Sequence, residues 1–133
     1  MKKYYLVLLF TITFCFANAQ VRFDTSFVQS QETHKNNHKL FFIDFMAEWC
    51  GPCKQMDKNV FRKQEVFTLL NEKFNPVRLN IDSPEGGSLF RKFSFEVIPS
   101  ILIIDANNNV KMRIEGYHSS KELIELLENV LKK

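Results

Sequence analysis

The 133-residue sequence has little of what marks several common protein classes. It has three cysteines, four glycines and four prolines, and no apolar run near the roughly 20 residues of a membrane-spanning helix. It has no internal repeat, low-complexity tract or linker, so we expect one domain. The net charge is +3, of which Lys2 and Lys3 supply two charges. The remaining excess is too small to indicate a nucleic-acid partner.

The first 19 residues have the pattern of a signal peptide. Lys2 and Lys3 precede the apolar run Tyr4–Phe16, and Ala17-Asn18-Ala19 forms a small-residue cleavage site. We therefore predict a signal peptide over 1–19, cleavage after Ala19 and an exported, periplasmic domain over 20–133. The alternative is an uncleaved N-terminal membrane anchor.

Cleavage would remove Cys15 and leave only Cys50 and Cys53. Two cysteines cannot form a disulfide framework or a zinc ribbon, and the three histidines lack zinc-finger spacing to them, so we expect no metal. Two cysteines in an exported protein often form a stabilising bridge, but a four-residue loop removes little chain entropy. The spacing therefore favours redox chemistry.

The cysteine pair follows an apolar run, Leu40–Met46, that predicts a buried strand. A helix after the pair would place it at the carboxyl end of a sheet strand, where sites lie in open α/β sheets. Cys50 would begin that helix, and the helix dipole favours a thiolate there. Lowering a cysteine pKa from about 8.5 to about 7 raises the thiolate fraction at neutral pH to roughly half.

The remaining pattern predicts a mixed sheet with helices on both faces, in the order β-α-β-α-β-α-β-β-α. Asn75 and Pro76 are expected to interrupt the chain before the third strand, and Ser119 and Glu122 form a capping box for the last helix. The expected strands are 21–23, 39–46, 77–82, 100–104 and 110–115. The expected helices are 25–35, 50–59, 64–73, 88–93 and 119–131, with a loop over 83–87.

Asp44–Lys54, which contains Trp-Cys-Gly-Pro-Cys-Lys, resembles the active-site segment of thioredoxin. Leu79–Asp82 resembles the third-strand segment of that family, Val97–Ser100 its cis-proline segment, and Gly116 the glycine before the last helix. The resemblance covers 21–133. It implies the thioredoxin fold and thiol–disulfide exchange without a bound cofactor.

Lys54–Phe61 is similar to a subgroup of that family, the exported thioredoxin-like proteins and the periplasmic C-terminal domain of the thiol:disulfide interchange protein. The sequence departs from thioredoxin itself at Met46, where a second tryptophan is usual, at Arg78, which replaces a lysine, and at Ser100, which replaces a threonine.

Cys50, at the expected helix start, is the candidate nucleophile, and Cys53 is the candidate resolving cysteine. The alternative is an inert pair. Asp44 lies among Phe42, Ile43 and Phe45, so burial should raise its pKa and make it a proton acceptor for the Cys53 thiol. The resemblance implies the same role, but strand alternation also allows a solvated Asp44.

The resemblance implies a cis peptide bond before Pro99, which would let Ile98 pair with a bound substrate strand. Trp49 is expected at the rim of that groove, or else as a structural tryptophan. Gly51 and Pro52 shape the backbone and, in the family, accompany reducing potentials.

Nearby charges receive no chemical role. Arg78 could offset the Asp44 charge or could be exposed. Glu48, Lys54, Asp57 and Lys58 are expected to be solvated.

The expected function is an exported thiol–disulfide oxidoreductase that reduces disulfides in protein substrates. We expect a monomer that has no cofactor and is re-reduced by a membrane thiol donor. The first alternative is a disulfide oxidase or isomerase. The second is a docking module of the same fold with incidental redox activity.

Overall fold

The computed structural model describes residues 19–133. The predicted signal peptide lies outside these residues except for Ala19, and Cys15 lies outside them as well. Among the described residues, no helix combines the length and apolarity needed to cross a membrane.

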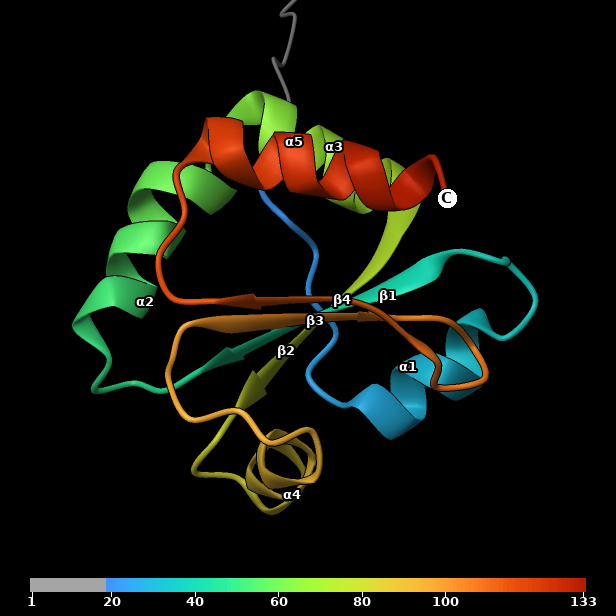
Figure 1. The fold of residues 1–133 in the computed structure, drawn as a ribbon, viewed down its shortest axis with the longest axis horizontal. Coiled ribbons are helices and arrows are strands. Elements are labelled where there is room, and N and C mark those ends of the chain that lie inside the picture. Colours follow the sequence, from blue (N-terminus) through green and yellow to red (C-terminus); the bar gives the residue numbers. More distant parts are fainter. Residues whose placement is uncertain (1–18) are drawn as a thin grey trace, which may run out of the picture.

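Four strands form one mixed sheet in the order β2-β1-β3-β4 (Figure 1). The central strand β1 (Leu40–Met46) pairs in parallel with β2 (Phe74–Asn80) and antiparallel with β3 (Ser100–Ile104). Strand β4 (Val110–Glu115) pairs antiparallel with β3. The predicted mixed sheet is confirmed.

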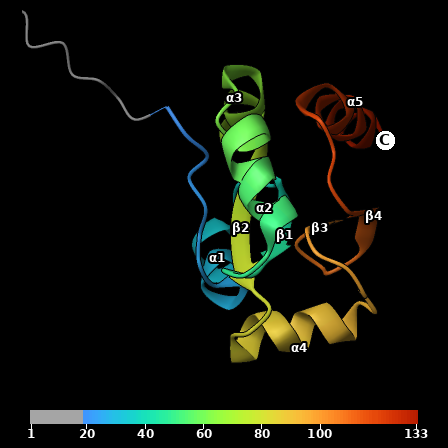
Figure 2. The ribbon, with the colours of Figure 1, turned by 90° about the vertical axis from the view of Figure 1, so that its left-hand side faces the viewer.

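Helices cover both faces of this sheet, as the two orthogonal views show (Figures 1 and 2). Helices α1 and α4 lie on one side, and α2, α3 and α5 lie on the other. A π-helical segment, η1, continues directly from α2, so the helical run after the cysteines extends beyond the predicted end at residue 59. The bounds are α1 Phe27–His34, α2 Gly51–Met56, η1 Asp57–Phe61, α3 Gln64–Lys73, α4 Pro84–Lys92 and α5 Ser120–Leu131.

Side-chain alternation along β1 supplies both halves of the core. Phe41, Ile43 and Phe45 enter the cluster beneath α1 and α4, whereas Phe42 enters the cluster beneath α3 and α5. Asp44 lies between these phenylalanines on a strand that is covered on both faces, and it is buried. The alternative of a solvated Asp44 is therefore excluded.

The predicted strand over 21–23 is wrong: the chain there makes one isolated bridge, between Asp24 and Val77 of β2. The Asp24 amide donates to the Pro76 carbonyl at 2.9 Å, and the Asp24 carbonyl accepts from the Arg78 amide at 2.8 Å. Pro76 belongs to β2 and does not interrupt it. Its backbone faces Asp24 rather than β1, so its missing N–H removes no bond from the β1–β2 ladder.

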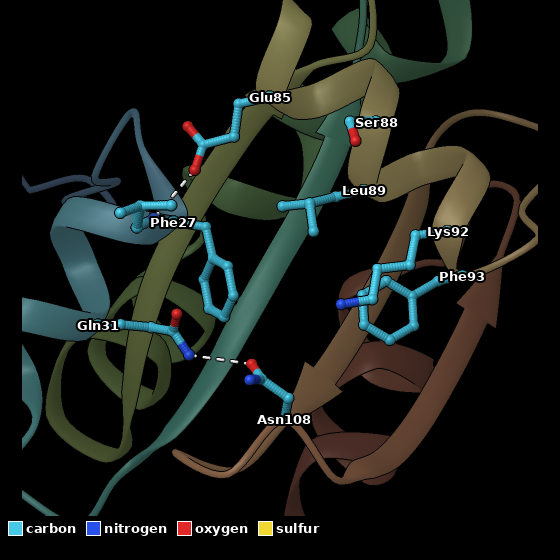
Figure 3. A pocket seen from close by; sticks show the side chains of 9 residues that line it. Phe27, Gln31, Glu85, Ser88, Leu89, Lys92, Phe93 and Asn108 are labelled. Carbon is cyan, nitrogen blue, oxygen red and sulfur yellow. Dashed lines mark hydrogen bonds between the residues drawn. The ribbon is translucent and has the colours of Figure 1, made fainter.

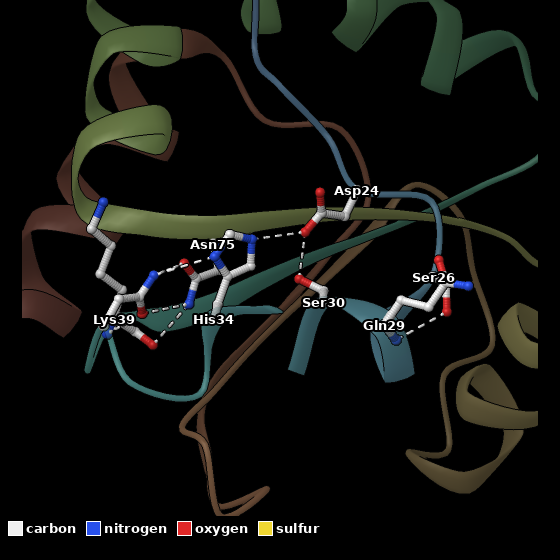
Figure 4. A network of polar contacts seen from close by, with 8 residues as sticks. Asp24, Ser26, Gln29, Ser30, His34, Lys39 and Asn75 are labelled. Carbon is white, nitrogen blue, oxygen red and sulfur yellow. Dashed lines mark hydrogen bonds and ion pairs between the residues drawn. The ribbon is translucent and has the colours of Figure 1, made fainter. Parts of the chain in front are cut away.

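The Asp24 side chain also fixes the N-terminal segment onto α1 (Figure 4). Its Oδ2 accepts a hydrogen bond from Ser30 Oγ at 2.6 Å and lies 3.0 Å from His34 Nε2. His34 is therefore a structural partner of Asp24 and not a solvated loop residue. Asn37 and Asn75 also exchange side-chain hydrogen bonds of 2.7 and 3.1 Å.

Helix α4 begins at Pro84, four residues before the predicted start, and includes Gly86 and Gly87. Ser83 caps it by accepting a hydrogen bond from the Gly86 amide at 3.1 Å. A Cβ atom at Gly86 would lie 2.1 Å from the Asn80 carbonyl oxygen. The two glycines therefore permit a close approach of α4 to the end of β2. The predicted loop over 83–87 is wrong, because it treated these glycines as helix breakers.

Gly86→Ala should lower the free energy of unfolding by about 2 kcal/mol, because the added methyl group meets backbone atoms that cannot move aside. Urea unfolding of the oxidised protein measures this. Gly51→Ala is the matched control, because its added Cβ meets no heavy atom within 4 Å other than those of Gly51, its two chain neighbours and the backbone of its own helix. Equal losses in the two variants would contradict the explanation.

Candidate active site

Cys50 and Cys53 lie where β1 passes into α2, and they are joined by a disulfide with a Cα–Cα distance of 5.3 Å. Both residues are buried, at 3% and 4% exposure. Ala47 completes their small cluster, against which Met46, Ile81 and Ile98 pack. The predicted placement of the pair at the carboxyl end of the central strand is confirmed.

Cys50 is the N-cap residue of α2, and its Sγ accepts a hydrogen bond from the Cys53 amide at 3.2 Å. The first amides of a helix have no partner within the helix and point toward its N-terminus. The same amide and the helix dipole favour a negative charge on Sγ once the disulfide is opened. The site is thus arranged to stabilise a Cys50 thiolate.

Asp44 lies in β1 with 2% of its surface exposed. Burial raises its pKa to about 6, although the neighbouring Arg78 guanidinium acts in the opposite direction. Its Oδ2 accepts from Arg78 Nε at 2.8 Å, whereas Oδ1 is the buried side-chain oxygen that has no hydrogen-bond partner in the described chain. One oxygen of the carboxylate is therefore free to accept a proton.

Arg78 is paired with Asp44 in the β1–β2 register and bridges it to a second carboxylate, that of Asp57. Arg78 Nη2 lies 2.6 Å from Asp57 Oδ1. Of the two alternatives for Arg78, charge compensation is correct. The expectation of a freely solvated Asp57 is wrong, because its side chain is bound and only 35% exposed. The sequence spacing could have predicted this contact, because Asp57 lies one helical turn after Cys53 and residues i and i+4 share a helix face.

The loop before β3 packs against the cysteines through Ile98, and the Ile98–Pro99 peptide bond is cis. The Pro99 carbonyl accepts from the Gly116 amide at 2.8 Å, and Ser100 Oγ donates to the Val97 carbonyl at 2.6 Å. The loop is thus fixed from both sides.

Trp49 is 67% exposed, and its indole Nε1 donates to Asp82 Oδ2 at 2.9 Å. The tryptophan is therefore a surface group beside the pair, held by a residue that our sequence analysis assigned only to a strand. Gly51 and Pro52 form the first turn of α2, where the missing N–H of proline removes no helical bond.

A cavity of about 300 Å³ lies away from this site, between α1 and α4 (Figure 3). Phe27, Leu89 and Phe93 form its apolar wall, and a hydrogen bond of 2.9 Å between Gln31 and Asn108 crosses its edge. None of the predicted site residues lines it.

Residues 27–131 match the family model described as a thioredoxin-like domain. The chain belongs to the thioredoxin-like family. The resemblance identified from the motif is therefore confirmed over residues 27–131.

Curated relatives include both free thioredoxins and larger proteins. Thioredoxin H2-1 of Oryza sativa subsp. japonica is 33% identical over 102 residues, which span 76% of this chain and 67% of that protein. The thiol:disulfide interchange protein DsbD of Photorhabdus laumondii is 28% identical over 102 residues, which span 74% of this chain but 18% of that protein. The chain thus corresponds to a small part of the DsbD proteins.

Solved structures agree with the fold. A solution structure of a candidate disulphide-isomerase from Bacteroides thetaiotaomicron is 27% identical, with a TM-score of 0.76 over 86% of this chain and 96% of that chain. The oxidised DsbD C-terminal domain of Neisseria meningitidis has a TM-score of 0.65 at 21% identity, over 77% and 90% of the two chains. The predicted thioredoxin fold and the class of thiol–disulfide oxidoreductase are confirmed at the level of the family.

Asp44→Asn should stabilise the oxidised protein at pH 8 by about 3 kcal/mol and change its stability at pH 4 by much less. In the unfolded chain Asp44 ionises at the ordinary aspartate pKa of 3.8, whereas in the folded protein its pKa is about 6. Between these values the folded state binds more protons, so wild-type stability falls as pH rises, and the amide removes this loss.

Urea unfolding at the two pH values checks this prediction. Asp57→Asn is the matched control, because it removes the half-exposed partner of Arg78 and leaves the buried charge in place. A gain of equal size at pH 4 and pH 8 would show that burial of the Asp44 charge is not its cause.

Proposed function

We propose that this protein is an exported reductase of disulfides in other proteins. The arrangement that carries the proposal is the cysteine pair with Cys50 at the start of α2 and the buried Asp44 nearby. Membership of the family indicates the class of reaction, and the structure suggests a different role for each of the two cysteines.

In the first step, the Cys50 thiolate attacks one sulfur of a substrate disulfide. A bond forms between Cys50 Sγ and that sulfur, the substrate S–S bond breaks, and the other substrate sulfur leaves as a thiolate. The amides at the N-terminus of α2 stabilise the attacking anion. The cis-Pro99 loop beside the pair positions Ile98 to contact the substrate backbone, and Trp49 borders the same region.

In the second step, Asp44 takes the proton of the Cys53 thiol through its unpartnered Oδ1, directly or by way of water. The Cys53 thiolate then attacks Cys50 Sγ, and the bond between Cys50 and the substrate breaks. The second substrate thiol is released and the Cys50–Cys53 disulfide forms. Two electrons have passed from the dithiol to the substrate, and a donor dithiol must return them.

The sequence of residues 1–19 supports export, and a partner outside the cytoplasm would then have to supply those electrons. We propose a membrane thiol donor, because relatives of this chain include the thiol:disulfide interchange proteins, of which it matches only a part. We also propose that the protein acts as a monomer.

One observation favours a second candidate, a disulfide isomerase: a neighbour in structure that is 27% identical is described as one. The reduction potential of the Cys50–Cys53 pair separates the two functions. A reductase should have a potential of about −200 to −270 mV, whereas a value near about −180 mV would favour the isomerase. A value near about −120 mV belongs to a strong disulfide donor and would also overturn the choice of direction.

Cys53→Ser should trap substrates as mixed disulfides on Cys50, because the attack that releases them is missing. The measurement is the recovery of reducible adducts from cells that express the full chain, followed by identification of the partners. Turnover of a disulfide-bonded protein such as insulin should fall to background.

Cys50→Ser should form no such adducts and should also be inactive. Full activity in Cys50→Ser would exclude the mechanism. Partners recovered equally well with a variant that lacks both cysteines would instead support a docking module.

A further inference from the structure

Two phenylalanine rings cover the guanidinium that compensates the buried Asp44. Arg78 Cζ lies 4.1 Å from the centroid of the Phe23 ring and 5.2 Å from that of Phe61. The two rings meet edge to face, with centroids 5.4 Å apart. The two rings therefore cover part of the guanidinium of Arg78, whose side chain is 23% exposed. Phe61 belongs to η1, but Phe23 comes from the N-terminal segment outside the sheet and helices.

Phe23 is held over Arg78 by its neighbour Asp24. The two backbone hydrogen bonds of Asp24 attach the segment to Pro76 and Arg78 of β2. Its carboxylate is bound in turn by Ser30 and His34 of α1 (Figure 4). The position of the Phe23 ring is thus fixed to the same strand that carries Arg78.

Arg78 is shared by two carboxylates of unequal exposure, Asp44 at 2% and Asp57 at 35% of the side chain. Arg62, which follows η1, lines the same small cavity as Arg78. The charges that act on Asp44, however, are those of Arg78 and Asp57. The β3 partner of Asp44 is the apolar Ile101. A guanidinium is better hydrated next to the partly exposed Asp57 than next to the buried carboxylate of Asp44. Without its cover, Arg78 would therefore keep its contact with Asp57 and move away from Asp44.

Space for such a shift is present. A cavity of about 170 Å³ borders Arg78 and is lined by Phe23, Asp57, Phe61 and Arg62 among others. The Phe23 ring forms part of its wall, so shortening this side chain would enlarge it and admit water to the guanidinium.

We propose that Phe23 is a positioning residue of the redox site: its ring keeps Arg78 on Asp44 and so sets the pH range in which Asp44 accepts the Cys53 proton. The proposal rests on the proposed role of Asp44. It extends the working site from the cysteine loop to the N-terminal segment.

The test follows the reaction of the reduced full-length protein, carrying Cys15→Ser so that only Cys50 and Cys53 react, with 5,5′-dithiobis(2-nitrobenzoate) by stopped flow across pH. Cys50 attacks the reagent and releases one thionitrobenzoate, leaving the other bound to Cys50. Cys53 then displaces the second one. The first phase thus reports on Cys50 and the second on deprotonation of Cys53.

Arg78→Met should move the midpoint of the second phase upward by about one pH unit, since an adjacent opposite charge lowers the pKa of a carboxyl by at least that much. Phe23→Ala should move it in the same direction by about half as much, because Arg78 is displaced and not removed. Phe23→Leu, which keeps an apolar side chain but no ring, should shift it the same way. Phe23→Tyr, which keeps an aromatic ring, should show the wild-type pH dependence of the second phase.

The double variant of Phe23→Ala and Arg78→Met decides whether Phe23 acts through the guanidinium. If it does, the double variant shows the shift of Arg78→Met alone. Phe67→Ala is the matched control, because Phe67 is a partly buried phenylalanine that packs against the same core cluster from α3. It should leave the midpoint of the second phase in place.

An unshifted second phase in both Phe23→Ala and Phe23→Leu, with a clear shift in Arg78→Met, would overturn the proposal for Phe23 and leave the role of Asp44 intact. A shift by Phe23→Ala that persists in the Arg78→Met background would overturn it as well. A second phase that Asp44→Asn does not change would instead refute the proposed proton acceptor.

Discussion

The buried ion pair between Asp44 and Arg78 is the contact around which the charged groups next to the cysteine helix are arranged. A carboxylate with 2% exposure in the middle of a central strand is costly to ionise, and one guanidinium at 2.8 Å offsets only part of that cost. The outcome is a carboxyl whose pKa is raised to about 6. Such a group can both take and return a proton near neutral pH. The ionised Asp44 therefore lowers the free energy of unfolding, in a strand whose other side chains form the core.

The sheet itself explains why this carboxylate faces the cysteine helix. In the parallel β1–β2 pair, Asp44 and Arg78 are direct partners and share a face. Helix α2 and η1 cover that face, and Asp57 at their junction reaches the same guanidinium. The three charged groups therefore come from two strands and one helical run, and β1–β2 pairing brings them together.

Much of this arrangement follows from local sequence pattern. The apolar run before the cysteines, the position of Cys50 at the helix start and the Ser119 capping box each depend on neighbouring residues, and the structure confirms all three. The burial of Asp44 followed from the phenylalanines around it. The start of α4 at Pro84 did not, because Gly86 is required by the nearby Asn80 carbonyl, which is a tertiary contact.

Residues that act across the fold could not be found in this way. Asp82 binds the Trp49 indole over 33 positions of sequence, and Phe23 covers Arg78 from a segment that pairs with β2 only at Asp24. Asp57 was a partial exception, since helical spacing alone places it below Cys53. Periodicity identifies which side chains are buried, but it does not tell which distant charges they meet.

The Asp24 bridge has a further consequence, for self-association. It pairs with the outer side of β2 at Pro76 and Arg78, whereas β4, at the other edge of the described sheet, has no partner strand on its outer side. An open edge of this kind invites pairing with another molecule. Exposed Lys111, Arg113 and Glu115 alternate along β4 and oppose such pairing by their charge and hydration. The charged side chains of β4 thus oppose fibrous aggregation at high concentration.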